Sequence, residues 1–300
     1  MLISDIIFQS GEFYGQSSKP SVISQYGPLI AAVTAIALFY AKIWYDRRED
    51  KTQKERDENN ALSYFVILLE SAIKFSEKQA ECYGDYSKRL IEKPLEYELL
   101  EVVVGGDLDR ILTKLDHERI LRAYIRRFGN DKKRILKFQT IFSRLDLISQ
   151  TCEAVKKTPE KHSTKLTERL TRYIDLADEK VLNRCSSLAD TIRKSDARHL
   201  NNPFYLALSS IIKKYIDNGP KLPAITYLQE GFILPLAQTL DKNFRNHEQA
   251  MQILIDCGKA IWLYNDTVNM SKAYAEEMQN DQNSLKKAIG ELKESSADLF

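Results

Sequence analysis

The feature that most constrains this chain is a long uncharged stretch close to its amino terminus. No residue from Pro20 to Ala41 carries a charge, and the apolar run over residues 27–44 reads GPLIAAVTAIALFYAKIW. These eighteen residues would rise about 27 Å as a helix, which is close to the hydrocarbon thickness of a bilayer. Tyr40 and Trp44 lie at the carboxyl end, where aromatic rings prefer the headgroup level. We therefore expect a transmembrane helix over residues 27–45; the alternative is a buried helix of a soluble protein.

The charges on either side of this span predict its orientation. The 26 residues before Gly27 contain one lysine and no arginine, whereas residues 46–58 contain five basic residues. Basic residues that flank a span stay on the cytoplasmic side. A cleavable signal peptide fits poorly, because the segment before the apolar run has a net charge of −1. We expect a short extracytoplasmic segment at 1–26, a charged juxtamembrane linker or helix at 46–60, and a cytoplasmic remainder. The chain would then be a single-pass protein of the plasma (inner) membrane.

Small residues recur within the span. Gly27, Ala31 and Ala35 are spaced four residues apart. Small side chains at this spacing let two helix backbones approach closely and promote lateral association. The spacing therefore predicts that the spans self-associate.

The remainder of the chain has the composition and periodicity of a helical bundle. Glycine and proline together make up 19 of 300 residues, about half of average usage, which argues against a turn-rich β fold. Apolar residues recur at helical spacing from Leu62 onward. We predict an all-α fold with one helical subdomain at 61–200 and a second at 201–300 packed on the first. The last two helices are expected near 242–278 and 281–298.

Local signals predict several helix ends. Asp107 and Asp116 each precede an apolar stripe and are expected to cap the helices that follow. Gly129 is expected to end the second of these helices. The segment 222–240 has one charge, Glu230, in nineteen residues. A kinked helix buried in the bundle is the simpler interpretation, and a second membrane contact is the alternative.

No catalytic, metal or cofactor motif stands out. The four cysteines are widely spaced and form no CxxC pair, and the chain contains no phosphate-binding loop. We therefore expect no cofactor, no metal site and no enzyme activity. Arg193 precedes His199 with five intervening residues, a spacing similar to that of the helical HEPN ribonucleases. That resemblance implies Arg193 and His199 as the catalytic pair of a membrane-tethered RNase, although a second pair with a similar spacing, Arg110 and His117, shows that chance can produce it.

Charge is concentrated in one stretch of an otherwise nearly neutral chain. Residues 110–144 hold eleven basic and three acidic side chains, a net charge of +8, whereas residues 276–300 have a net charge of −3. The stretch is either a solvated helix face partly neutralised by acidic helices, or a surface that binds anionic lipid, nucleic acid or an acidic protein. The candidate binding residues are the basic side chains Arg119, Arg122, Arg126, Arg127, Lys132, Lys133, Arg134 and Lys137.

The layout of one amino-terminal span and a helical cytoplasmic body resembles many bacterial membrane proteins, some of which act in phage defence. Three functions follow from these patterns. The first is a non-enzymatic anchored scaffold, sensor or adaptor that binds a partner at the cytoplasmic face. The second is a membrane-perturbing effector whose spans cluster, and the third is the tethered RNase. The expected partners are the lipid bilayer and a protein or a second copy of the chain, with nucleic acid as the alternative.

Overall fold

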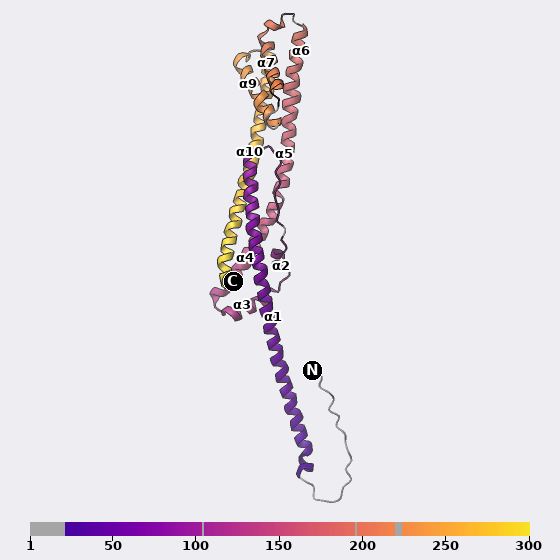
Figure 1. The fold of residues 1–300 in the computed structure, drawn as a ribbon, viewed down its shortest axis with the longest axis vertical. Helices are drawn as coiled ribbons and strands as arrows, with labels where there is room; N and C mark the ends of the chain where they lie inside the picture. Colours follow the sequence, from indigo (N-terminus) through magenta and orange to yellow (C-terminus); the bar gives the residue numbers. More distant parts are fainter. Residues whose placement is uncertain (1–21, 104, 196, 220–223) are drawn as a thin grey trace, which may run out of the picture. The chain divides into compact units, whose positions relative to one another are not determined.

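A computed structural model describes residues 22–300 apart from 104, 196 and 220–223 (Figure 1). The described part is all-α and contains no strand, so the predicted fold class is confirmed there. Two short elements, η1 and η3, are π-helical, and η2 and η4 are 3-10 turns. In chain order the elements are α1 (Val22–Glu92), α2 (Asp107–Thr113), α3 (His117–Phe128), α4 (Lys132–Lys156), α5 (Thr158–Ile174), η1 (Asp175–Leu182), α6 (Asn183–Ser195), η2 (His199–Asn201), α7 (Pro203–Asn218), α8 (Ala224–Leu228), η3 (Gln229–Ile233), α9 (Leu234–Asn243), α10 (Glu248–Ser296) and η4 (Ala297–Leu299).

The chain divides into two compact units, Met1–Ala61 and Leu62–Phe300. The described part of the first unit is the beginning of α1. It includes the one helix among the described residues that is long and apolar enough to cross a membrane, and its apolar window is not buried. The charged residues 46–60 continue the same helix. Residues 1–21 of the predicted extracytoplasmic segment lie outside the described residues.

The second unit, hereafter the body, is built along α10. This helix is 49 residues long and packs against α4, α5 and α9. The last part of α1 runs beside α10 (Figure 1): the hydroxyl of Ser87 donates to the carbonyl of Ala275 at 2.8 Å, and the amide of Gln282 donates to the carbonyl of Ala80 at 2.8 Å. Helices from both predicted subdomains, 61–200 and 201–300, therefore share one packing helix.

The carboxyl-terminal prediction was wrong in one respect. The two helices expected at 242–278 and 281–298 are a single helix, α10, preceded by a turn after Asn243. The expected break fell at residues 279 and 280, just before Gln282. Gln282 is instead buried and bonded to the backbone of α1, which keeps a polar residue inside a continuous helix.

The structure tests the predicted helix ends and the segment 222–240. Asp116 caps α3 by accepting from the backbone amide of Arg119 at 3.0 Å, and Gly129 ends that helix with φ of +101°, as predicted. Asp107 does not cap α2. It is the first helical residue, and its carboxylate accepts from Ser71 Oγ at 2.6 Å. The described residues of 222–240 form α8, η3 and most of α9, with one face in a core cluster, as expected for a buried helix.

Candidate partner-binding surface

The basic stretch folds as a hairpin of α3 and α4 that is fixed to the body by aromatic side chains. The rings of Phe65 on α1 and Phe142 on α4 stack with centroids 5.4 Å apart. Phe138 lies 5.2 Å from Tyr124 of α3, and the ring of His117 lies 4.4 Å from Phe142. Tyr124 and Phe138 are buried. The apolar stripe of α3 therefore packs inward, and its arginines are left on the outer side.

A groove of about 810 Å³ lies on this hairpin and is called the α3–α4 groove. Its apolar lining comes from Leu121, Phe138, Phe142 and Leu147, of which Leu147 is 39% exposed. The lining residues on α4 run from Phe138 to Gln150, thirteen positions whose ends are about 18 Å apart along the helix. That length matches about three turns of a partner helix. The polar and charged lining residues are His117, Glu118, Gln139, Ser143, Arg144, Asp146 and Gln150.

The basic residues predicted as a binding surface all lie on the hairpin, but in different surroundings. Arg122 pairs with Glu118 at 2.6 Å and Arg134 pairs with Asp131 at 3.1 Å, each within its own helix region. The guanidinium of Arg127 lies 5.2 Å from the ring centroid of its neighbour Phe128. The side chains that are exposed around the turn between the two helices are Arg126, Arg127, Lys132 and Lys133, and Arg119 is half-buried.

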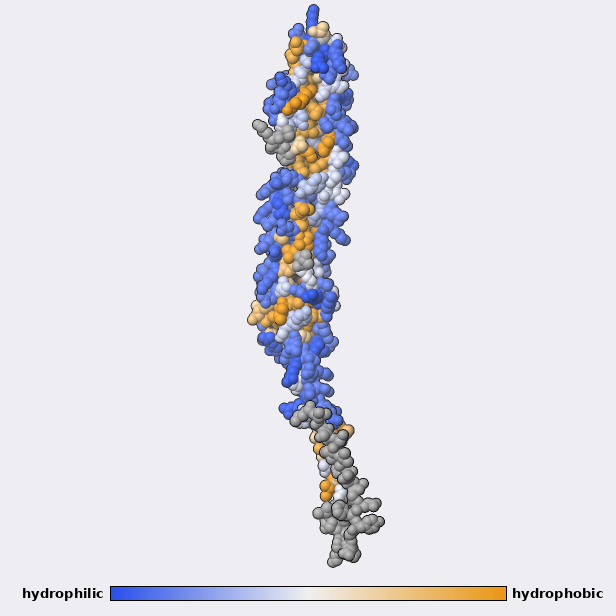
Figure 2. Space-filling model, turned by 45° about the vertical axis from the view of Figure 1, so that its right-hand side comes forward, coloured by the Kyte–Doolittle hydropathy of each residue, from blue (hydrophilic) through white to orange (hydrophobic). Residues whose placement is uncertain are grey.

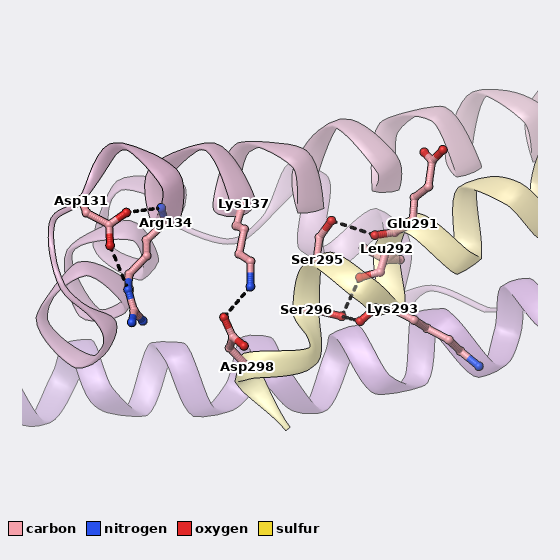
Figure 3. A network of polar contacts seen from close by, with 9 residues as sticks. All are labelled: Asp131, Arg134, Lys137, Glu291, Leu292, Lys293, Ser295, Ser296 and Asp298. Atoms are coloured by element: carbon pink, nitrogen blue, oxygen red, sulfur yellow. Dashed lines mark hydrogen bonds and ion pairs between the residues drawn. The ribbon is translucent and has the colours of Figure 1, made fainter.

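The acidic end of α10 neutralises part of the basic stretch, as one of the sequence interpretations predicted. Lys137 Nζ lies 2.7 Å from the carboxylate of Asp298, and Arg144 Nε lies 2.6 Å from that of Glu291. Figure 3 shows Lys137 and Asp298 pointing toward each other from α4 and η4. The hydrogen bond from Lys137 holds the pKa of Asp298 below its ordinary value and raises the pKa of Lys137. Both groups are charged at neutral pH.

The residues predicted for the span are arranged along one exposed helix. Ala31, Ala35, Tyr40 and Trp44 are exposed in the first unit. The guanidinium of Arg48 lies 5.4 Å from the ring centroid of Trp44. An aromatic ring with a cation one turn later is typical of the membrane–water interface.

The predicted ribonuclease pair, Arg193 and His199, lies on α6 and η2. Arg193 is exposed at the end of α6 and pairs with Asp190 at 3.1 Å. It lines a cavity of about 340 Å³ between α6 and α7, and the lining includes Tyr205 but not His199. The ring of His199 packs edge-on against Tyr205 at 5.1 Å.

A serine–histidine contact, which the sequence did not indicate, is buried in the body. His162 Nε2 lies 3.0 Å from Ser271 Oγ, and Ser271 donates to the carbonyl of Pro94 at 2.6 Å. Both side chains are at most 2% exposed, so no substrate reaches them. Burial lowers the pKa of His162. The contact ties α5 and α10 to the segment after α1.

Within the described part of the chain, no three histidine, cysteine or acidic side chains form a group that could hold a metal ion. Cys152, Cys185 and Cys257 are buried, and Cys82 is half-buried. Burial raises the pKa of the Cys185 and Cys257 thiols to about 12. These thiols are therefore protonated and unreactive at neutral pH.

No protein-family model matches the chain, and no curated protein or solved structure shows significant similarity to it. The functional assignment below therefore depends on the surfaces described above.

Proposed function

We propose that this chain is a membrane-anchored, non-enzymatic helical module that binds a protein partner at the cytoplasmic face of the plasma membrane. The observation that carries the proposal is the exposed apolar helix in the first unit. From Leu29 to Tyr45 its described side chains are exposed, except for the half-buried Ile43. A core helix would bury such side chains, and a bilayer removes them from water equally well. The five basic residues after the span support an external amino terminus.

The α3–α4 groove supports partner binding by the body. Figure 2 shows apolar patches between polar side chains on one face of the molecule, and an apolar groove flanked by polar residues is typical of a helix-binding site. Leu121 and Leu147 give the groove its aliphatic lining, and Phe138 and Phe142 give it its aromatic lining. We infer that the partner inserts an amphipathic helix of about three turns. Arg144 is already paired with Glu291, so apolar contact would provide most of the affinity.

Membrane placement is tested first. Full-length protein should stay in the membrane pellet after alkaline carbonate extraction. A protease added outside intact cells should remove an amino-terminal tag and leave a carboxyl-terminal tag. Release by carbonate, or removal of the carboxyl-terminal tag, would contradict the anchoring and orientation.

Partner binding is tested by affinity purification from detergent-solubilised membranes. Wild type should retain a stoichiometric protein that Leu147→Glu loses, because a carboxylate in the groove must be desolvated when the partner binds. Leu99→Glu is the matched control, because Leu99 is 83% exposed on the connection between α1 and α2. Recovery of the chain without a protein partner, or equal retention by Leu147→Glu, would count against the groove as the binding site.

A further inference from the structure

A second surface of the same hairpin differs from the groove in its concentrated positive charge. It comprises residues 126–136, where α3 ends and α4 begins, and is called the hairpin tip. The tip contains five basic residues and one acidic residue, a net charge of +4. Asp131 caps α4 and pairs with Arg134, so its negative charge interacts within the tip itself. The acidic end of α10 pairs with Lys137 and Arg144, which lie outside it.

The tip also carries an exposed apolar side chain between positive charges. Leu136 is 50% exposed. It follows Lys132 by four residues and Lys133 by three, so the three side chains are neighbours on α4. Both lysines are exposed, and neither forms an ion pair among the described residues. An apolar side chain flanked by ammonium groups is suited to the boundary between headgroups and acyl chains.

The packing of α4 places the tip at the end of the body where the chain enters. Near the start of the body, Phe65 of α1 stacks on Phe142 of α4. Farther along both helices, Tyr83 contacts Cys152. Within the body α4 therefore runs parallel to α1, and its amino-terminal end lies on the entry side. Only twenty residues separate Phe65 from Tyr45, the last residue of the expected span.

We propose that the hairpin tip docks on the surface of a bilayer that contains anionic lipids, as a second membrane contact beside the span. The exposed Leu136 favours this surface over nucleic acid, because an apolar side chain among cations can enter the acyl-chain boundary, whereas phosphates of nucleic acid offer it no apolar contact. The anchor raises the local concentration of the tip at the membrane. Each basic residue near an anionic surface contributes about five-fold to docking. The proposal rests on the membrane anchoring proposed above.

The test uses the full-length chain reconstituted into vesicles. Cys82→Ala removes the accessible thiol, and Asn130→Cys in the turn of the tip carries an environment-sensitive fluorophore. Quenching by lipids with a nitroxide on the acyl chain reports docking. Quenching should be strong in vesicles with 30% phosphatidylglycerol, weak in pure phosphatidylcholine, and reduced by 0.5 M NaCl.

Two charge variants and one matched control define the outcome. Lys132→Gln with Lys133→Gln should lower the docking equilibrium constant about 25-fold, from about five-fold for each lysine. Lys286→Gln with Lys287→Gln removes the same charge from two exposed lysines of α10 and should leave it unchanged. Asp298→Asn should raise docking about five-fold, because the carboxylate that partly offsets Lys133 and Arg134 of the tip and pairs with the adjacent Lys137 is removed.

Equal quenching in neutral and anionic vesicles, or an equal effect of the two lysine pairs, would overturn the proposal. So would an RNA oligonucleotide that removes the quenching by competing for the tip. Flotation with pure phosphatidylcholine vesicles after a carbonate wash reports the anchor separately. Flotation without lipid-dependent quenching would therefore refute tip docking and leave the anchor intact, whereas loss of flotation would refute the anchor.

Discussion

Gly84 on α1 provides a sharp test of how α1 packs on α10. A Cβ atom at this position would lie 2.2 Å from Nε2 of Gln282, and its three nearest atoms all belong to that side chain. Gln282 is buried, donates to the carbonyl of Ala80 and accepts from Gln279. The substitution Gly84→Ala must therefore displace the amide and break its hydrogen bonds. Leaving this amide unsatisfied costs about 1–3 kcal/mol, while replacing glycine by alanine within a helix gains about 1 kcal/mol.

The expected net effect of Gly84→Ala is a loss of about 1 kcal/mol of unfolding free energy. In a Gln282→Ala background the obstruction is gone, so the same substitution should stabilise the protein by about 1 kcal/mol. The coupling energy between the two positions is then about 2 kcal/mol. Urea unfolding of the full-length chain in detergent, followed by circular dichroism, should show midpoint shifts of opposite sign, each about 0.3 M for a slope of about 3 kcal/mol/M. A shift of the same sign in both backgrounds would refute this packing of α1 on α10.

Three further predictions concern the span, the ribonuclease alternative and the buried histidine. Ala31→Leu with Ala35→Leu should abolish cross-linking between spans and any dye entry on overexpression, because larger side chains separate the helix backbones; unchanged cross-linking would exclude this face. Purified protein should not cleave RNA, and cleavage that both Arg193→Ala and His199→Ala remove would establish the ribonuclease instead. Burial lowers the pKa of His162 below about 6.5, so the unfolded chain binds the proton first as pH falls. The stability that neutral His162 provides is full above pH 6.5 and is lost below it. His162→Gln should flatten the loss of unfolding free energy between pH 7 and pH 5, and an equally steep loss would show that other groups control it.

The parts of the fold that depend on neighbouring residues could be predicted from the sequence. The cap by Asp116 and the stop at Gly129 depend on atoms within one helical turn, and both were predicted correctly. Helical periodicity depends only on which residues share a face, so the all-α class followed from it. Asp107 was misassigned because its carboxylate bonds to Ser71, 36 residues earlier in the chain. The break expected in α10 was wrong for a similar reason. Gln282, next to that position, bonds to Ala80, which is 202 residues away in the sequence.

The candidate site could not be predicted without the tertiary structure, because it too depends on contacts between residues that are far apart in the sequence. The groove depends on Phe142 stacking on Phe65 and on the register of α3 against α4, and no local pattern encodes either. The basic residues themselves were evident from the sequence. Their partners were not, because Lys137 and Asp298 are 161 positions apart. The groove residues Phe138 and Phe142 are four positions apart in an apolar stripe, and such a stripe gives no indication of which of its side chains border an open groove.

The packing of the acidic tail divides the basic stretch into the two surfaces proposed above. Glu291 pairs with Arg144 at the groove and Asp298 pairs with Lys137 between the two surfaces, whereas Lys132 and Lys133 are exposed at the tip. The leucine and phenylalanine side chains of the groove favour a protein helix, and the charged tip favours anionic headgroups. Substitutions within residues 110–144 should therefore separate into two classes. Those in the groove should reduce partner retention without altering its salt dependence, and those at the tip should reduce only the salt-sensitive docking on lipid.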